Sequence, residues 1–150
     1  MTVGAGTEIT TFATTSSQNI TTNAQTLDFP VTFNGIGGTF QLQDALTLDS
    51  TQPLTLTNGT LKLKSGTTNT VGSFATSGTN QKFLSATTPG TQATLSDVSG
   101  TNSVSYLTIQ DSAATGGAVF QAFTSNFNVD SGNNTGWKFS NNGGNFLMFF

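Results

Sequence analysis

Carboxylates are the first side chains to consider for acid–base chemistry, because the 150 residues include no His, the commonest general base, and no Cys or Arg. Two carboxylates on either side of a glycosidic bond can act as acid and base or nucleophile. The available carboxylates are Glu8, Asp28, Asp44, Asp49, Asp97, Asp111 and Asp130. They are scattered among Thr, Ser, Asn and Gly, where aspartate usually closes a turn. We therefore predict no catalytic residue and no enzyme.

Metal, cofactor and nucleic-acid sites are equally poorly supported. Residues 130–134 (DSGNN) could offer oxygen ligands to calcium, but a calcium loop usually carries more acids, and this composition is typical of a turn. We predict no metal and no cofactor. A net charge of −3 without arginine argues against nucleic acid as a partner. No apolar run reaches the ~18 residues of a membrane-spanning helix.

Two aromatic side chains are candidates for contact with a glycan. The chain has 13 Phe but one Tyr and one Trp, Tyr106 and Trp137. Either ring could stack on a sugar. A single Trp next to Gly136 and close to Phe139 is also typical of a core position, so both interpretations of Trp137 stay open.

The C-terminal apolar run is the most unusual feature of the sequence. It could be a last strand packed on the core, a plug between subunits or, less in keeping with the preceding chain, the end of a membrane barrel. Left exposed on a monomer it would be a liability, whereas each side chain fully buried between subunits contributes about 1.5–3 kcal/mol. The candidate assembly interface is Phe146, Leu147, Met148, Phe149 and Phe150.

Short alternating segments predict an all-β protein. Residues 27–33 alternate apolar and polar side chains, as do the runs Leu54–Leu56 and Leu61–Leu63 on either side of Asn58-Gly59, and strand-like pieces recur every ~8–12 residues. Grouped more loosely, the apolar runs recur about every 20 residues, within the range of solenoid turns. The prediction is a short parallel β-helix, or solenoid. The alternative is an antiparallel β-sandwich or jelly roll, because Asn58-Gly59 fits a hairpin as well as a solenoid corner.

The domain organisation follows from a change in pattern near residue 27. Residues 1–26 are mostly Thr, Ser, Gly, Asn and Gln, and they predict an N-terminal arm or cap. Residues 27–150 predict a single all-β domain.

Three blocks in the second half carry a resemblance to a known class. They are GTQATLS at residues 90–96, YLTIQDSAATGG at 106–117 and NNTGW at 133–137. In this order they resemble the terminal coils of right-handed parallel β-helix modules in phage structural proteins and bacterial surface proteins. The resemblance covers about residues 83–139. It implies a β-helix fold, and it is compatible with tail fibres, tailspikes, decoration proteins and adhesins.

The function expected from these features is structural. We expect a non-catalytic phage virion protein, in a tail, a fibre or the capsid surface, that self-assembles and displays a host-facing surface. Its partners would be copies of itself, such as a trimer, other virion proteins and a host polysaccharide. The alternatives are a secreted bacterial adhesin or extracellular filament subunit, which would place it at a cell surface and need a signal peptide upstream of residue 1, and a glycan-binding module.

Overall fold

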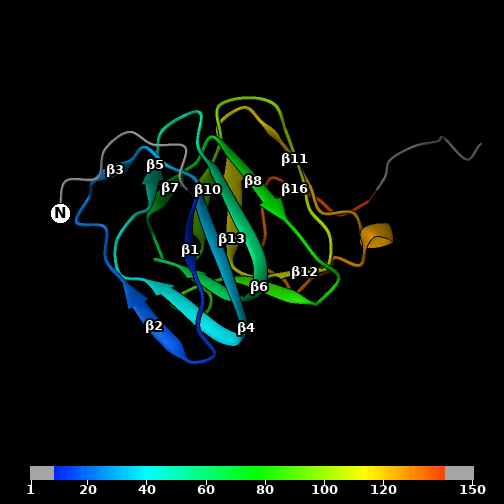
Figure 1. The fold of residues 1–150 in the computed structure, drawn as a ribbon. Coiled ribbons are helices and arrows are strands. Elements are labelled where there is room, and N and C mark those ends of the chain that lie inside the picture. Colours follow the sequence, from blue (N-terminus) through cyan, green and yellow to red (C-terminus); the bar gives the residue numbers. More distant parts are fainter. Residues whose placement is uncertain (1–8, 141–150) are drawn as a thin grey trace, which may run out of the picture.

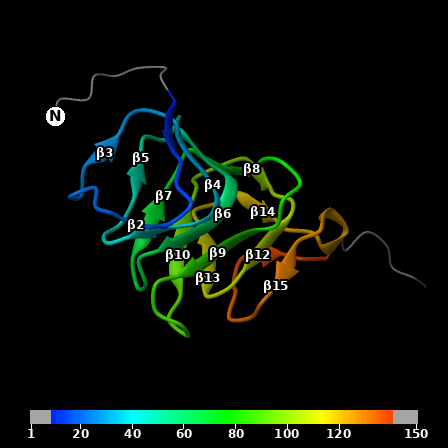
Figure 2. The ribbon, with the colours of Figure 1, turned by 60° about the horizontal axis from the view of Figure 1, so that its bottom comes forward.

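The computed structural model describes residues 9–140, which wind into a β-solenoid of about six turns. The turns stack along one axis, so the colours in Figure 1 and Figure 2 pass from blue at one end of the stack to orange at the other. None of the helical segments in the described part of the chain is long and apolar enough to cross a membrane.

Three sheets form the walls of the solenoid. Sheet A, the longest, contains β1 (Thr10–Phe12), β2 (Ser17–Ile20), β4 (Val31–Leu42), β6 (Pro53–Leu63), β8 (Ser73–Thr76), β9 (Lys82–Ala86), β12 (Leu107–Ile109) and β15 (Val129–Asp130). Sheet B contains β3 (Thr26–Leu27), β5 (Thr47–Leu48), β7 (Thr68–Thr70), β10 (Ala93–Ser96) and β13 (Ser112–Thr115). Sheet C contains β11 (Thr101–Ser103), β14 (Val119–Gln121) and β16 (Trp137–Lys138), and a 3₁₀ turn, η1 (Thr124–Asn126), precedes β15.

Parallel pairing confirms the solenoid and excludes the sandwich alternative. Val31 pairs with Leu54, and Leu54 pairs in turn with Phe74, each time one turn further along the chain. The strand pairs within the described residues are parallel throughout, as the stacking of successive turns requires. Antiparallel neighbours joined by hairpins, which a sandwich needs, do not occur among them.

Most of the segment expected to be an arm or cap forms the first turn. β1 and β2 pair in parallel with the two halves of β4, and β3 pairs with β5. The alternation predicted to be one strand over residues 27–33 is interrupted, because β3 ends at Leu27 and β4 begins at Val31. Pro30 lies at that corner, where its missing N–H costs no ladder bond.

The core is a column of apolar side chains that point inward from every turn. In sheet A, alternation buries Phe40, Leu61, Leu84 and Ile109 one above another, and each is 1% exposed or less. At such positions a leucine or phenylalanine contributes about 1.5–3 kcal/mol when it is fully buried. A shift of register by one residue would turn this column out to the solvent, so the alternation fixes the pairing.

The two Asn-Gly pairs in β4 and β6 lie at stacked corners within these long strands and do not form hairpins. Asn34 and Asn58 are register partners in successive turns, and the Asn58 side-chain amide donates to Asn34 Oδ1 over 2.7 Å. Gly59 has a φ of 94°, and a Cβ added there would meet the Gly35 carbonyl oxygen at 2.4 Å. Glycine is needed at this corner both for the backbone conformation and for the close stacking of turns.

Replacing Gly59 by alanine is expected to destabilise the fold by about 2 kcal/mol more than Gly66→Ala. Gly66 has a φ of 71° and nothing within 4 Å of an added Cβ, so its variant meets only the conformational cost of about 1–2 kcal/mol. Gly59→Ala adds a backbone clash, which costs about 1–3 kcal/mol. Denaturant unfolding followed by circular dichroism measures both variants. Equal losses would show that stacking does not depend on this glycine.

Buried asparagine side chains form hydrogen bonds to backbone groups of neighbouring turns. Three such side chains are 3% exposed or less: Asn69, Asn102 and Asn128. The Asn69 Oδ1 atom accepts from the Leu46 N–H of the preceding turn, and its Nδ2 donates to the Thr94 carbonyl of the next, both over 3.0 Å. Asn102 and Asn128 likewise accept from backbone N–H groups of the turn before. These amides satisfy backbone groups that would otherwise be buried without partners.

Asn69→Ala is expected to lower the free energy of unfolding by about 3 kcal/mol. The change leaves two backbone groups unsatisfied, and each costs about 1–3 kcal/mol when buried. Asn58→Ala is the matched control, because its amide ladder is open to water, and its loss should stay below about 1 kcal/mol. Chemical denaturation compares the two. Similar losses would refute a special role for the buried amides.

Candidate functional site

The aspartates of the described residues are all engaged in turns or in contacts between turns. Each accepts at least one hydrogen bond from a backbone N–H or a side chain; the residues are Asp28, Asp44, Asp49, Asp97, Asp111 and Asp130. Asp97, for example, accepts from Ser99 N–H and from Asn102 Nδ2, and Asp111 accepts from Gly90 N–H and Asn133 Nδ2. These contacts tie successive parts of the coil together. Glu8 lies outside the described residues.

Asp44 is the described aspartate whose pKa is clearly shifted by its surroundings. Its carboxylate accepts from the Thr22 N–H over 2.9 Å and from the Ala24 N–H over 3.3 Å, which links the first two turns. Burial pushes the pKa of Asp44 upward, but these hydrogen bonds outweigh it and hold the pKa below its ordinary value. The preference for the charged form therefore stabilises the corner at Asn23 and Ala24, where both φ angles are positive.

The loop at residues 130–134 forms a turn. Asp130 Oδ1 accepts from the Gly132 N–H over 3.0 Å and from Asn134 Nδ2 over 2.7 Å. Asn134 Oδ1 in turn accepts from the Ser112 N–H of the preceding turn. The oxygens that calcium would need are thus used within the loop and by its neighbour. No group of three or more His, Cys, Asp or Glu side chains within residues 9–140 could hold a metal ion.

Trp137 lies in the core, and only 8% of it is exposed. Its ring packs edge-on against Phe120 and Phe74, with centroids 5.2 and 6.2 Å apart. Its indole N–H donates to Ser112 Oγ over 3.1 Å. The indole therefore closes the core near the last described turn and offers no free face on which a sugar could stack.

The outer face of sheet A carries continuous rows of side chains. Because the strands are parallel and in register, one row crosses every turn: Ser17, Thr39, Thr60, Phe83, Thr108 and Val129. The next row contains Asn19, Gln41, Lys62 and Ser85. Hydroxyl and amide groups thus repeat at the strand spacing of ~4.8 Å along the solenoid.

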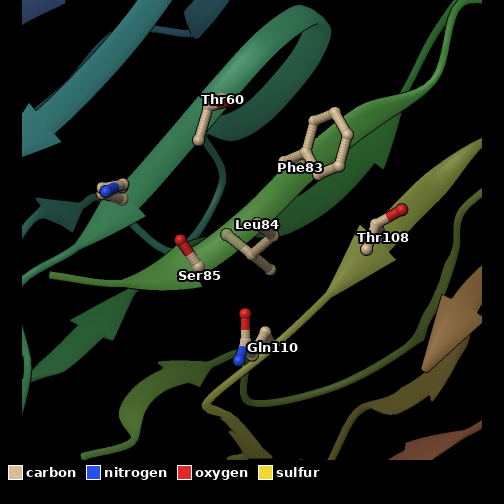
Figure 3. A pocket seen from close by; sticks show the side chains of 7 residues that line it. Thr60, Phe83, Leu84, Ser85, Thr108 and Gln110 are labelled. Carbon is tan, nitrogen blue, oxygen red and sulfur yellow. The ribbon is translucent and has the colours of Figure 1, made fainter. Parts of the chain in front are cut away.

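A hollow of about 350 Å³ lies on this face between β6, β9 and β12. We call it the sheet A groove; it is lined by Thr60, Lys62, Phe83, Leu84, Ser85, Thr108 and Gln110. In Figure 3 the Phe83 ring stands between Thr60 and Thr108, which come from the neighbouring strands. Phe83 is 46% exposed, and its two neighbours in the row, Thr60 and Thr108, are hydroxyl residues. An exposed aromatic face among hydrogen-bonding groups suits a ligand that is both ring-shaped and polar.

Tyr106 immediately precedes β12 and belongs to a stacked aromatic pair. Its ring stacks on Phe127 with centroids 4.6 Å apart and planes 15° apart, and Phe127 is 61% exposed. Both residues have left-handed backbones, with φ of 52° and 60°. Such conformations cost about 1–3 kcal/mol each, more than the ~0.5–1.5 kcal/mol from stacking. Hydrogen bonds between turns, including Tyr106 N–H to the Asn126 carbonyl, must therefore hold the pair in place.

Sequence reasoning missed the exposed aromatics because they sit in apolar runs. Phe83 precedes Leu84, and only one of two neighbours in a strand can face the core. Phe127 and Val129 look like inward positions, but the buried residue between them is Asn128. The polar amide takes the inward place because it satisfies the Leu107 N–H, and the apolar neighbours consequently face outward. Adjacent apolar pairs such as Phe83-Leu84 were the one available signal.

The candidate assembly interface Phe146–Phe150 lies outside the described residues. Comparison with known proteins does not extend the argument, because no family model, curated protein or solved structure matched the chain. The site must therefore be interpreted from its own geometry.

Asp44→Asn is expected to lower the free energy of unfolding by about 1 kcal/mol at pH 7, because it replaces a charged acceptor of two backbone N–H groups by a neutral one. A lowered pKa stabilises the fold fully above the ordinary value near 3.8, and this contribution disappears as the pH falls through the lower folded value. The gap between wild type and variant should therefore close in acid. Urea unfolding from pH 7 to pH 2 measures it, with Asp28→Asn as control. A gap that is independent of pH would contradict the assignment.

Proposed function

We propose that this chain is a non-catalytic structural protein of a phage virion, a component of a tail, a fibre or the capsid surface. The observation that carries the proposal is the outer face of sheet A, whose rows of mostly uncharged side chains extend over the stacked turns of a rigid solenoid. A surface of this kind suits display to a host. The resemblance of residues 83–139 to phage β-helix modules supports the same assignment.

The roles of the aspartates support a non-catalytic assignment. Every aspartate within residues 9–140 accepts hydrogen bonds from turn backbone or from side chains, either within its own turn or from a neighbouring one. A catalytic pair would need two carboxylates that converge on one cleft. The sheet A groove, in contrast, has no carboxylate among its lining residues. The proposed role is therefore to position and present a surface.

The open ends of the solenoid support self-assembly. Among the described residues, β1 and β15 end sheet A, β3 ends sheet B and β11 and β16 end sheet C, whereas β13 at the other end of sheet B is bridged to Thr135. Strands at such ends have unpaired backbone groups on one side, which natural proteins cover with caps or partner chains. We propose that copies of this chain assemble into a homo-oligomer such as a trimer through Phe146–Phe150, in contact with other virion proteins.

A glycan-binding module of a bacterial adhesin or extracellular filament is the second candidate. The sheet A groove favours it, since an exposed Phe83 beside Thr60 and Thr108 could receive a sugar in either setting. The two candidates share the surface and differ in location, a virion in one case and a cell surface in the other. Detection of the chain in purified particles would separate them.

The full chain is expected to form a discrete oligomer in solution, and a variant that lacks residues 146–150 is expected to be smaller. Light scattering coupled to size exclusion measures both masses against the monomer mass of 15.5 kDa. Circular dichroism of the truncated form provides the control that the solenoid remains folded. A full chain that is monomeric at every concentration would overturn the self-assembly proposal.

A further inference from the structure

We infer that the sheet A groove binds an acidic polysaccharide whose sugar units carry carboxylate groups. The inference rests on the proposed display function and names the class of ligand that the displayed face would take. It depends on three properties of this face: an exposed aromatic ring, a repeated set of hydrogen-bonding groups, and a local positive charge on an acidic chain.

The aromatic ring is the first property. Phe83 is 46% exposed at the centre of the groove, although its row neighbours Thr60 and Thr108 show that a hydroxyl residue fits the same sheet position. The apolar face of a pyranose ring can pack on such an exposed phenyl group. The stacked pair of Tyr106 and Phe127, which lie just before β12 and β15, adds a second aromatic surface, since Phe127 is 61% exposed.

Repeated hydrogen-bonding groups are the second property. Thr60 and Thr108 flank Phe83 in one row, and Lys62 and Ser85 occupy the next. Gln110 follows β12 and lines the same hollow. Because these side chains repeat at the strand spacing of ~4.8 Å, a linear polymer that lies along the solenoid would meet similar groups at each step. The hollow of about 350 Å³ is open and shallow enough for a chain to pass across it.

Charge is the third property, and it selects the acidic class. The chain has 4 Lys and a net charge of −3, but Lys62 lines the groove and no carboxylate does. Lys64 follows β6 and is exposed. Lys82 is buried beneath the same face, where its ammonium donates to the Gly78 and Asn80 carbonyls and lies 5.7 Å from the Tyr106 ring. The positive charge gathered here is complementary to a polyanion.

The test uses purified full-length protein and three uronate polymers, polygalacturonate, alginate and hyaluronate, each paired with its neutral methyl-esterified form. Titration calorimetry in low salt and in 0.5 M NaCl measures the dissociation constants. We expect binding to at least one acid polymer, at least tenfold weaker binding to its ester, and a marked loss of affinity in high salt. Failure to bind any of the acids, or equal affinity for acid and ester, would overturn the inference.

Matched variants locate the binding site. Phe83→Thr continues the hydroxyl row and should weaken binding tenfold or more, while Lys62→Gln should weaken it about threefold to tenfold and reduce its dependence on salt. Ile36→Thr and Lys138→Gln, which change an exposed apolar residue and an exposed lysine away from the groove, should leave affinity unchanged. If the control variants weaken binding as much as the groove variants, or if the groove variants have no effect, the sheet A groove is not the binding site.

The same samples separate this inference from the proposed function. Light scattering of each variant reports assembly, which the groove substitutions should not alter. An assembled protein that binds no acidic polymer would overturn the ligand and leave the structural role standing. A monomeric protein that binds through Phe83 and Lys62 would retain the ligand and overturn the self-assembly.

Discussion

Parallel stacking of turns is the constraint on which the rest of the structure depends. Each turn must place its strands in register with the turn before, so that an inward leucine meets an inward leucine at about 4.8 Å. Corners then stack as well, and the Cβ that alanine would add at Gly59 would reach the Gly35 carbonyl. The same closeness requires partners for buried backbone groups at the corners, which Asn69 and Asn128 supply. Core, corners and surface rows therefore follow from one geometric repeat.

Within residues 9–140, hydrogen bonds between neutral side chains, and not ion pairs, join the turns. Charged residues make up 7% of the chain, compared with roughly a quarter in ordinary domains. Successive turns are joined instead by ladders such as Asn34, Asn58 and Asn80, in which each amide donates to the one before. Asp44 also joins neighbouring turns, but through a charged group. Its carboxylate accepts hydrogen bonds from the N–H groups of a turn whose backbone is left-handed. Because the groups in such ladders carry no net charge, salt screens them little.

The outer face of sheet A combines two features. It is regular, since parallel register repeats the same row position at every turn, and it is interrupted by Phe83 at the centre of a hollow. The strained, stacked pair of Tyr106 and Phe127 is held on the following turns by contacts between coils. A rigid scaffold that fixes exposed aromatic rings loses little conformational freedom when a ligand binds, and this is how a shallow surface can still be selective.

The amino-acid sequence by itself determined the all-β class, the inward alternation of residues 54–56 and 61–63 and the dispersed placement of the aspartates, because side-chain alternation and turn chemistry are local properties. It left Asn58-Gly59 compatible with both a hairpin and a solenoid corner, since that choice depends on which distant strand pairs with β6. Tertiary structure alone decided that Leu84 faces inward and Phe83 outward, that Asn128 is buried between two exposed apolar residues, and that Trp137 belongs to the core. These outcomes depend on the register between strands whose residues are about 20 positions apart in the sequence. The residues next to each position do not reveal that register.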